Sequence, residues 1–397
     1  MRIVFNGVHE RRKNLPLLLK AVSMARRNNG VDIVVDVIGE GPETSSWKSL
    51  CTKLGLDGCV FWHGWVEKSK ALDIVATADV FAITSVHDLT STVLLEALAS
   101  GKPVVCIDHC GFSDVINDSC GIKIQINDTE SMVQSFADAF SRLSVDAAFL
   151  NRLSEGAKRR AAEYAWSRKR AVLNEIYRPE WKKILVSAYA CSPYRGSEPG
   201  MGWNFLRLIA DDDAREVWAV VEKDEFENPI REYLASHPTE MRNVHFVFIR
   251  RTHLNWLRKI WPPSYYWTYR LWQNAVYRTA QGLHEKICFD CVHQLNMVGF
   301  REPGYLWKLP VPFVWGPIGG LGRTDWRLVA SLNISGKMEF LARNLINSFQ
   351  ARFLRRPRAA ARKAAETGSL LSATSENMRE ALRLWNTPSK VLCEIGT

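Results

Sequence analysis

Long apolar runs are missing from this 397-residue chain, and none reaches the roughly 18–20 residues that a membrane-spanning helix needs. The first residues, Met1–Gly7, become polar too soon for a signal peptide and are typical of a buried strand entering a turn. Low-complexity segments and short-period repeats are also absent. These absences argue against an integral membrane or repeat protein, and we expect a globular protein of the cytoplasm.

Cysteines are few and show no pattern of pairing. The nine cysteines are scattered along the chain, which argues against a disulfide framework in a cytosolic protein of this length. Cys288 and Cys291 form one CxxC, but no second cysteine pair or histidine pair stands at metal-ligand spacing. We expect buried free thiols, with a metal or redox role at this CxxC as the alternative.

Length and charge both indicate two domains. A single hydrophobic core rarely grows beyond roughly 250–300 residues. Residues 1–181 hold 22 Lys and Arg against 22 Asp and Glu, whereas residues 182–397 hold 30 against 20. The net charge of +10 therefore lies entirely in the second half, and we expect the two halves to have different partners.

Strand-like apolar runs alternate with helical patterns in both halves. Each half opens with a short strand, a glycine-bearing loop and a helix, at about Leu15–Arg26 in the first and Gly202–Ala210 in the second. This alternation predicts two α/β domains with doubly wound parallel sheets, whose ligands bind beyond the carboxyl ends of the strands. The expected strands are 2–5, 31–38, 60–62, 80–83, 104–107, 122–126, 183–188, 217–221, 244–249, 292–295, 313–315 and 370–373.

We expect the domain boundary near Trp181. A helical pattern over residues 146–176 is broken by Tyr177–Trp181, and the following residues resemble the start of a new protein. The predicted domains are therefore 1–178 and 182–397.

The most informative stretch for function is His87–Val105. It follows a strand and opens a helix that Gly101 and Pro103 end, with Asp88, Thr90 or Ser91 able to cap the first turn. The N–H groups at a helix start bind phosphate well, so the stretch suits a phosphate-bearing ligand. The alternative is an ordinary capped helix with Glu96 in solvent.

This stretch resembles the E-x7-E region of the family 4 retaining glycosyltransferases, which have the GT-B fold. The match includes Glu96–Val105 and the turn at Gly111–Val115. The resemblance implies that Asp88, with Leu89, Thr90 and Ser91 beside it, contacts the donor sugar, and that Glu96 binds the ribose. The chain departs from the family at Asp88, which is one methylene shorter than the usual glutamate.

A second segment, Asn6–Leu15, resembles the phosphate loop of the same family, with Gly7 at its turn. Lys13 falls where the family binds the donor diphosphate, and a cation there would stabilise the leaving nucleotide. The usual arginine is replaced by Val8, so that Arg11 or Arg12 is expected to compensate. The resemblance covers nearly all of residues 1–178 and implies that they form the donor-binding domain. Without the resemblance, the basic residues around Lys13 would be interpreted as an ordinary basic cluster on the surface.

Residues 182–397 resemble the acceptor-binding domain of family members that build exopolysaccharides. A glycine-rich loop follows the first strand, and glycines let a backbone approach a phosphate or sugar closely. The candidate residues of this acceptor or phosphate loop are Gly196, Ser197, Glu198, Gly200 and Gly202.

Two further segments of this half carry candidates. Asp290–Gln294 resembles the family strand end that places a histidine at the reacting sugar, which makes His293 a catalytic candidate beside Asp88. The alternative for His293 is a structural histidine. Trp315–Gly320 resembles a loop that faces the cleft, with a simple tight turn as its alternative.

The positive excess is concentrated in two segments without acidic residues. Residues 241–284 hold seven Lys and Arg and ten aromatic residues, among them Arg250, Arg251, Arg258 and Lys259, and residues 340–365 form the second segment. Basic and aromatic side chains together suit an anionic membrane surface. Nucleic acid and a solvated helix face are the alternatives.

The order of the two halves is reversed relative to the family, which places the acceptor domain first. We therefore expect a GT-B protein with swapped domains, as a circular permutant or as a fusion of two gene fragments. The resemblance implies sugar transfer from a nucleotide diphosphate to a saccharide or lipid-linked acceptor, with retention and with no metal or other cofactor. A nucleotide-sugar epimerase, a phosphorylase and a non-catalytic binding protein remain as alternatives.

Overall fold

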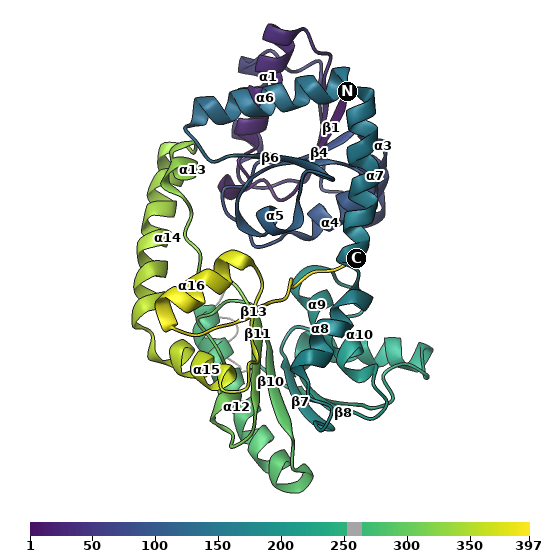
Figure 1. Cartoon of the computed structure of the whole chain (residues 1–397), viewed down its shortest axis with the longest axis vertical. Coiled ribbons are helices and arrows are strands. Elements are labelled where there is room, and N and C mark those ends of the chain that lie inside the picture. Colours follow the sequence, from purple (N-terminus) through teal and green to yellow (C-terminus); the bar gives the residue numbers. More distant parts are fainter. Residues whose placement is uncertain (252–263) are drawn as a thin grey trace. The chain divides into compact units, whose positions relative to one another are not determined.

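The computed structural model describes residues 1–251 and 264–397, and Arg258 and Lys259 lie outside this range (Figure 1). The chain divides into two compact units. The first contains residues 1–165, 323–346 and 396–397, and the second contains residues 166–322 and 347–395. The segment 323–346 thus belongs to the first unit, although it comes from the second half of the sequence.

The first unit is built on a six-stranded parallel sheet with the order β3-β2-β1-β4-β5-β6. The inner strands β4 and β5 are buried along their whole length, which explains their uninterrupted apolar sequences. The strands are β1 (Arg2–Asn6), β2 (Val34–Ile38), β3 (Val60–Gly64), β4 (Val80–Ile83), β5 (Val104–Ile107) and β6 (Gly121–Ile124).

Helices connect these strands, as expected for a doubly wound sheet. They are η1 (Arg11–Lys13), α1 (Leu15–Asn29), α2 (Thr44–Lys53), α3 (Lys68–Thr77), α4 (Thr92–Ala99), α5 (Cys110–Val115), α6 (Thr129–Val145) and α7 (Ala147–Glu163). From the later segment come α13 (Trp326–Ala330) and the first part of α14 (Ile334–Phe353). Leu328, Val329, Leu332 and Phe340 of this segment are buried in the hydrophobic core of the first unit.

The second unit has a seven-stranded parallel sheet with the order β13-β12-β11-β10-β7-β8-β9. Its strands are β7 (Lys183–Ala188), β8 (Glu216–Glu222), β9 (Val244–Ile249), β10 (Cys291–Asn296), β11 (Phe313–Ile318), β12 (Leu370–Ser372) and β13 (Lys390–Val391). Its helices are α8 (Trp166–Ile176), α9 (Ser197–Ala210), α10 (Lys223–Ser236), α12 (Ser264–Ile287), η3 (Leu306–Lys308), the end of α14, α15 (Arg355–Ala365) and α16 (Ser375–Trp385).

The predicted fold class, two Rossmann-like parallel α/β domains, is confirmed, and every predicted strand is present. The helical pattern over residues 146–176 forms two helices, α7 and α8, interrupted at Tyr164 and Ala165. Leu173, Ile176 and Tyr177 are buried in the core of the second unit, so α8 is part of that unit.

Candidate functional site

The turn after β1 is packed tightly against the turn after β2, because the carboxyl ends of neighbouring parallel strands meet at one sheet edge. The N–H of Gly7 donates to the carbonyl of Ile38 at 3.1 Å. Gly39 has a φ of +112°, and a Cβ there would lie 2.1 Å from the carbonyl oxygen of Gly7. Only glycine fits at this position, and the contact fixes the start of the predicted phosphate loop.

Lys13 lies on η1 and reaches across Gly7, where an added Cβ would lie 3.4 Å from Lys13 Cε. Its buried ammonium donates to Asp88 Oδ2 at 2.5 Å, and Arg12 Nη1 lies 3.3 Å from the same oxygen. The structure therefore brings Gly7, Arg12, Lys13 and Asp88 together beyond the carboxyl ends of β1 and β4.

The surroundings keep Asp88 charged. Burial acts to raise the pKa of Asp88, but the charges of Lys13 and Arg12 and the N–H of Leu89 outweigh it, so the pKa lies below its ordinary value. The N–H of Leu89 donates to Asp88 Oδ1 at 3.1 Å. Asp88 is therefore an internal counter-ion for two cations.

Helix α4 begins at Thr92, four residues after Asp88, and Ser91 is its N-cap residue. Ser91 has a φ of 70° and its side chain caps nothing, so the predicted cap by Ser91 is wrong. Thr90 is buried, and Leu89 is half-buried beside it. Glu96 lies one turn into α4, where Lys68 approaches its Oε1 at 2.8 Å.

Arg11 and Arg12 have different surroundings. Arg12 donates a hydrogen bond to Glu10, and its guanidinium also lies near Asp88. Arg12 is therefore part of the candidate site. Arg11 instead pairs with Glu43 and with Glu339 of α14, at 3.0 and 2.9 Å. Of the two arginines expected to compensate for Val8, Arg12 is thus the better placed.

The segment 323–346 also holds the loop that carries Asp88. His87 Nδ1 lies 3.0 Å from the hydroxyl of Thr324, and its ring packs edge-on against Phe340. Burial, followed by the positive charge of Arg343, lowers the pKa of His87 to about 3, so the ring is neutral. No short-range sequence signal indicated this contact, because the partners are more than 200 positions apart.

The glycine-rich loop of the second unit is shaped by contacts within the domain. A Cβ on Gly200 would lie 2.3 Å from the carbonyl oxygen of Arg195, and one on Gly202 would lie 2.2 Å from that of Ala190. We predicted that these glycines let a phosphate or sugar come close to the loop. At Gly200 and Gly202 the space is taken instead by carbonyl groups of the protein itself.

The helix after this loop starts earlier than predicted, since α9 begins at Ser197 with Gly196 as its N-cap. Gly196 and Ser197 are exposed. Glu198 Oε1 accepts a hydrogen bond from the N–H of Val298 at 2.9 Å, and burial raises the pKa of Glu198.

His293 lies in the middle of β10, between β7 and β11, and has no exposed surface. Its Nδ1 pairs with the hydroxyl of Tyr177 at 2.5 Å and its Nε2 with the carbonyl of Gly316 at 2.8 Å. Burial lowers the pKa of His293 to about 4. Both ring nitrogens are engaged inside the domain, which favours the structural alternative for His293, and its contact with a sugar stays a prediction.

The segment Trp315–Gly320 differs from the predicted loop as well. Strand β11 continues through it to Ile318, and Trp315 is fully buried in the core. The CxxC cysteines also face different surroundings, because Cys288 is exposed and Cys291 is buried, and both are free thiols.

Two arginines of the predicted membrane patch are paired with acids of α10 and the strand before it. Arg250 donates to Asp224 at 3.0 Å, and Arg251 approaches Glu222 and Glu225 at 2.8 and 2.5 Å. These acids lie outside the acid-free window of residues 241–284. The two arginines therefore count as uncompensated charges in the sequence window but are paired with acids in the fold.

The first unit is similar to a family of known proteins. Residues 2–160 match the family of glycosyl transferases group 1. This glycosyltransferase-like region contains all the donor-site candidates, from Gly7 to Glu96, and none of the candidates of the second unit.

Individual relatives match the chain over a similar length. A D-inositol 3-phosphate glycosyltransferase from Arthrobacter sp. (strain FB24) is 28% identical over 178 residues, covering 44% of this chain and 42% of the relative. The lipopolysaccharide core biosynthesis glycosyltransferase LpsE of Rhizobium meliloti (strain 1021) is 32% identical over 144 residues, covering 36% and 39%. The chain thus spans about two fifths of the length of the relatives that it matches.

A solved structure shows the same extent of similarity. The catalytic domain of the cholesterol-α-glucosyltransferase from Helicobacter pylori is 19% identical, with a TM-score of 0.37, and the match covers 42% of this chain and 99% of that domain.

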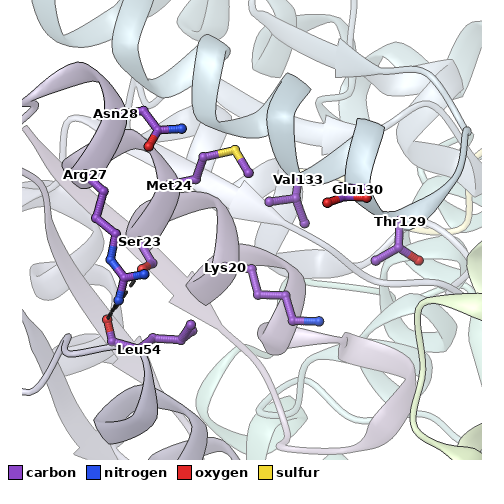
Figure 2. A pocket seen from close by; sticks show the side chains of 9 residues that line it. All are labelled: Lys20, Ser23, Met24, Arg27, Asn28, Leu54, Thr129, Glu130 and Val133. Atoms are coloured by element: carbon purple, nitrogen blue, oxygen red, sulfur yellow. Dashed lines mark hydrogen bonds between the residues drawn. The ribbon is translucent and has the colours of Figure 1, made fainter.

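The glycosyltransferase-like region also has a cavity of about 540 Å³ away from the candidate site (Figure 2). Its walls come from the second half of α1, the start of α6 and Leu54, and Arg27 donates to the carbonyl of Leu54 at 3.2 Å. None of the donor-site candidates lines it.

Proposed function

We propose that this protein is a glycosyltransferase that moves a sugar from a nucleotide diphosphate to a hydroxyl group of a saccharide or lipid-linked acceptor. The observation that carries the proposal is the contact between Lys13 and Asp88 at the sheet edge, inside the region that matches the glycosyltransferase family. The proposed pathway is polysaccharide biosynthesis, and the proposed stereochemistry is retention of the anomeric configuration.

In this proposal the donor replaces an internal ion pair. The diphosphate takes Lys13 and Arg12 as its cations, and their charge stabilises the leaving nucleotide diphosphate. Asp88, released from Lys13, then accepts hydrogen bonds from hydroxyl groups of the sugar. Glu96 accepts from the ribose in place of Lys68, an exposed partner that is exchanged at little cost.

We propose that the reaction needs no metal ion, because Lys13 and Arg12 supply the positive charge that a divalent cation would otherwise bring to the diphosphate. The nucleotide sugar is a substrate, and no further cofactor is proposed. The domains 1–178 and 182–397 are proposed as the donor and acceptor halves of a GT-B enzyme in circularly permuted order.

A different class of function is also compatible with the site. Val8 stands where the family has an arginine, and Arg11 is bound to Glu43 and Glu339, so the diphosphate meets fewer free cations. A non-catalytic nucleotide-sugar-binding protein, or an epimerase or phosphorylase with the same donor site, is the second candidate.

Product analysis separates these candidates. The full-length protein is incubated with a panel of nucleotide sugars, with and without saccharide acceptors, and the released nucleotide and the sugar products are measured. A glycosyltransferase releases nucleotide only when an acceptor is present, and added EDTA leaves the rate unchanged. An epimerase converts the sugar without an acceptor, a phosphorylase requires phosphate, and a binding protein releases nothing.

We further propose that the protein works at the inner face of the plasma membrane, on a lipid-linked acceptor, and not on nucleic acid. In the described residues no helix is long and apolar enough to cross a membrane. The membrane contact would therefore be peripheral.

A further inference from the structure

Helix α14 carries a stripe of large apolar side chains that nothing in the described residues covers. Ile334, Met338, Leu345, Phe349 and Phe353 are 82%, 66%, 73%, 64% and 60% exposed. Their spacing of four or seven residues places them along one side of the helix. Leu341 and Ile346, 48% and 55% exposed, extend the same stripe.

The stripe is additional to the face by which α14 packs on the protein. Gly336, Phe340, Asn347 and Ala351 form the buried face, and Asn347 is hydrogen-bonded to Arg301 and to the carbonyl of Gly322. Single exposed apolar residues are ordinary on protein surfaces, whereas seven on one helix form a contiguous patch that indicates an interaction site.

The sequence that contains and follows the stripe is strongly basic. Residues 334–365, which include α15, contain eight Lys and Arg and a single acid, Glu339. Glu339 is bound to Arg11. Among the described residues no carboxylate lies within ion-pair distance of four exposed arginines of this region: Arg343, Arg352, Arg355 and Arg362.

We propose that α14 lies flat in the interface of an anionic membrane, with its apolar stripe in the boundary between head groups and acyl chains. The exposed arginines then contact lipid phosphates. The helix has 20 residues and is therefore about 30 Å long, which gives a long, shallow contact.

The positive charge near the stripe favours an anionic bilayer, rather than a second copy of the chain, as its binding partner. Pairing two α14 stripes would bring two sets of unpaired arginines together, whereas an anionic bilayer offers the apolar layer and the negative charge at once. This inference deepens the proposed function, on which it rests for the lipid-linked acceptor. Of the two basic segments found in the sequence, it assigns the membrane contact to the second, which overlaps α14.

The test is flotation of the full-length protein with vesicles of phosphatidylcholine alone or mixed with phosphatidylglycerol. We expect binding to the anionic vesicles that weakens as salt is added. The double variant Leu345→Glu with Phe349→Glu changes only exposed side chains and should reduce partitioning by about tenfold or more, since each buried large apolar side chain contributes roughly a factor of ten.

Two further variants make the result specific. Val145→Glu changes an 80% exposed apolar residue at the end of α6 and should bind vesicles like the wild type. Arg352→Glu with Arg355→Glu should remove the preference for anionic vesicles while some binding to the apolar layer remains.

Unchanged binding of the Leu345→Glu, Phe349→Glu variant would overturn the proposal, as would absence of wild-type binding to anionic vesicles. A wild-type dimer that this variant converts to a monomer, without vesicle binding, would assign the stripe to a second copy instead. Nucleotide binding, measured on the same variants by calorimetry, should be unchanged. Vesicle binding by a protein with no transferase activity would refute the proposed function and leave the membrane contact standing.

Discussion

At the scale of single residues, Asp88 is the centre of the candidate site. Its carboxylate holds the buried ammonium of Lys13 and lies near the guanidinium of Arg12. A buried ammonium without a counter-ion is costly, and in the proposed function the donor diphosphate takes over this role from Asp88.

The pH dependence of stability should report this ion pair. The folded-state pKa of Asp88 lies below its ordinary value of 3.8, so its contribution is complete above that value and is lost as pH falls through the lower folded pKa. We expect the unfolding midpoint of the wild type to drop more steeply below about pH 4 than that of Asp88→Asn. Thermal unfolding from pH 3 to 7 measures this, and parallel curves for the two proteins would refute the pairing.

His293 gives a second prediction at this scale. Its replacement by alanine leaves the hydroxyl of Tyr177 and the carbonyl of Gly316 without their partner, which should cost about 1–3 kcal/mol of stability. We expect a lower unfolding temperature for His293→Ala, with unchanged nucleotide affinity and a normal rate below that temperature. A variant of wild-type stability that has lost its transferase rate would instead support the catalytic assignment of His293.

At the scale of secondary-structure elements, the strands could be predicted from sequence because their apolar runs are short and bounded by turns. The helix starts were less predictable. Helix α9 begins at Ser197 because the glycines that suggested a loop are needed for contacts with Arg195 and Ala190 inside the domain. Tertiary packing, which the local pattern does not contain, decides such boundaries.

Helix α14 shows the same limit more strongly. Its sequence has apolar residues on two sides, and periodicity alone does not say which side is buried. The structure buries Phe340 in the first unit and leaves Phe349 exposed. The ion pair of Glu339 with Arg11 depends on which side of α14 packs, so it could not be read from the sequence.

A matched pair of substitutions tests this orientation. Phe340→Ala removes a buried ring and should destabilise the protein by about 3–5 kcal/mol, whereas Phe349→Ala removes a 64% exposed ring and should change stability by less than about 0.5 kcal/mol. Urea unfolding of both variants measures the difference. Equal effects, or a larger effect of Phe349→Ala, would show that the other face of α14 is packed.

At the scale of the whole molecule, the two-unit architecture follows from chain length and from the alternation of strands and helices. The unequal charge of the two halves was also visible in the sequence, but its meaning changes with the fold. Arg250 and Arg251 are neutralised by acids from elsewhere in the chain, while Arg352 and Arg355 are exposed. Charge counts over stretches of sequence showed which half of the chain is basic. They could not show which surface is basic, because acids from distant parts of the chain pair with some of the arginines.

The donor site was predicted more fully, because motif spacing fixes which residues follow the strand ends. Gly7, Lys13 and Asp88 were expected at one site, and the structure brings them together. The ion pair between Lys13 and Asp88 was not foreseen, since nothing in a motif says that a cation and an acid of one binding site pair with each other.

The central claim is that Lys13 binds the donor diphosphate, and calorimetric titration of UDP, GDP and ADP into the full-length protein tests it most directly. For whichever nucleotide binds, Lys13→Met should weaken affinity about 10- to 150-fold, corresponding to the loss of a charge-assisted hydrogen bond of about 1.5–3 kcal/mol. Lys20→Met, which removes an exposed lysine from the cavity of Figure 2, is the matched control and should bind like the wild type. A folded Lys13→Met variant with the affinity of Lys20→Met would contradict the account.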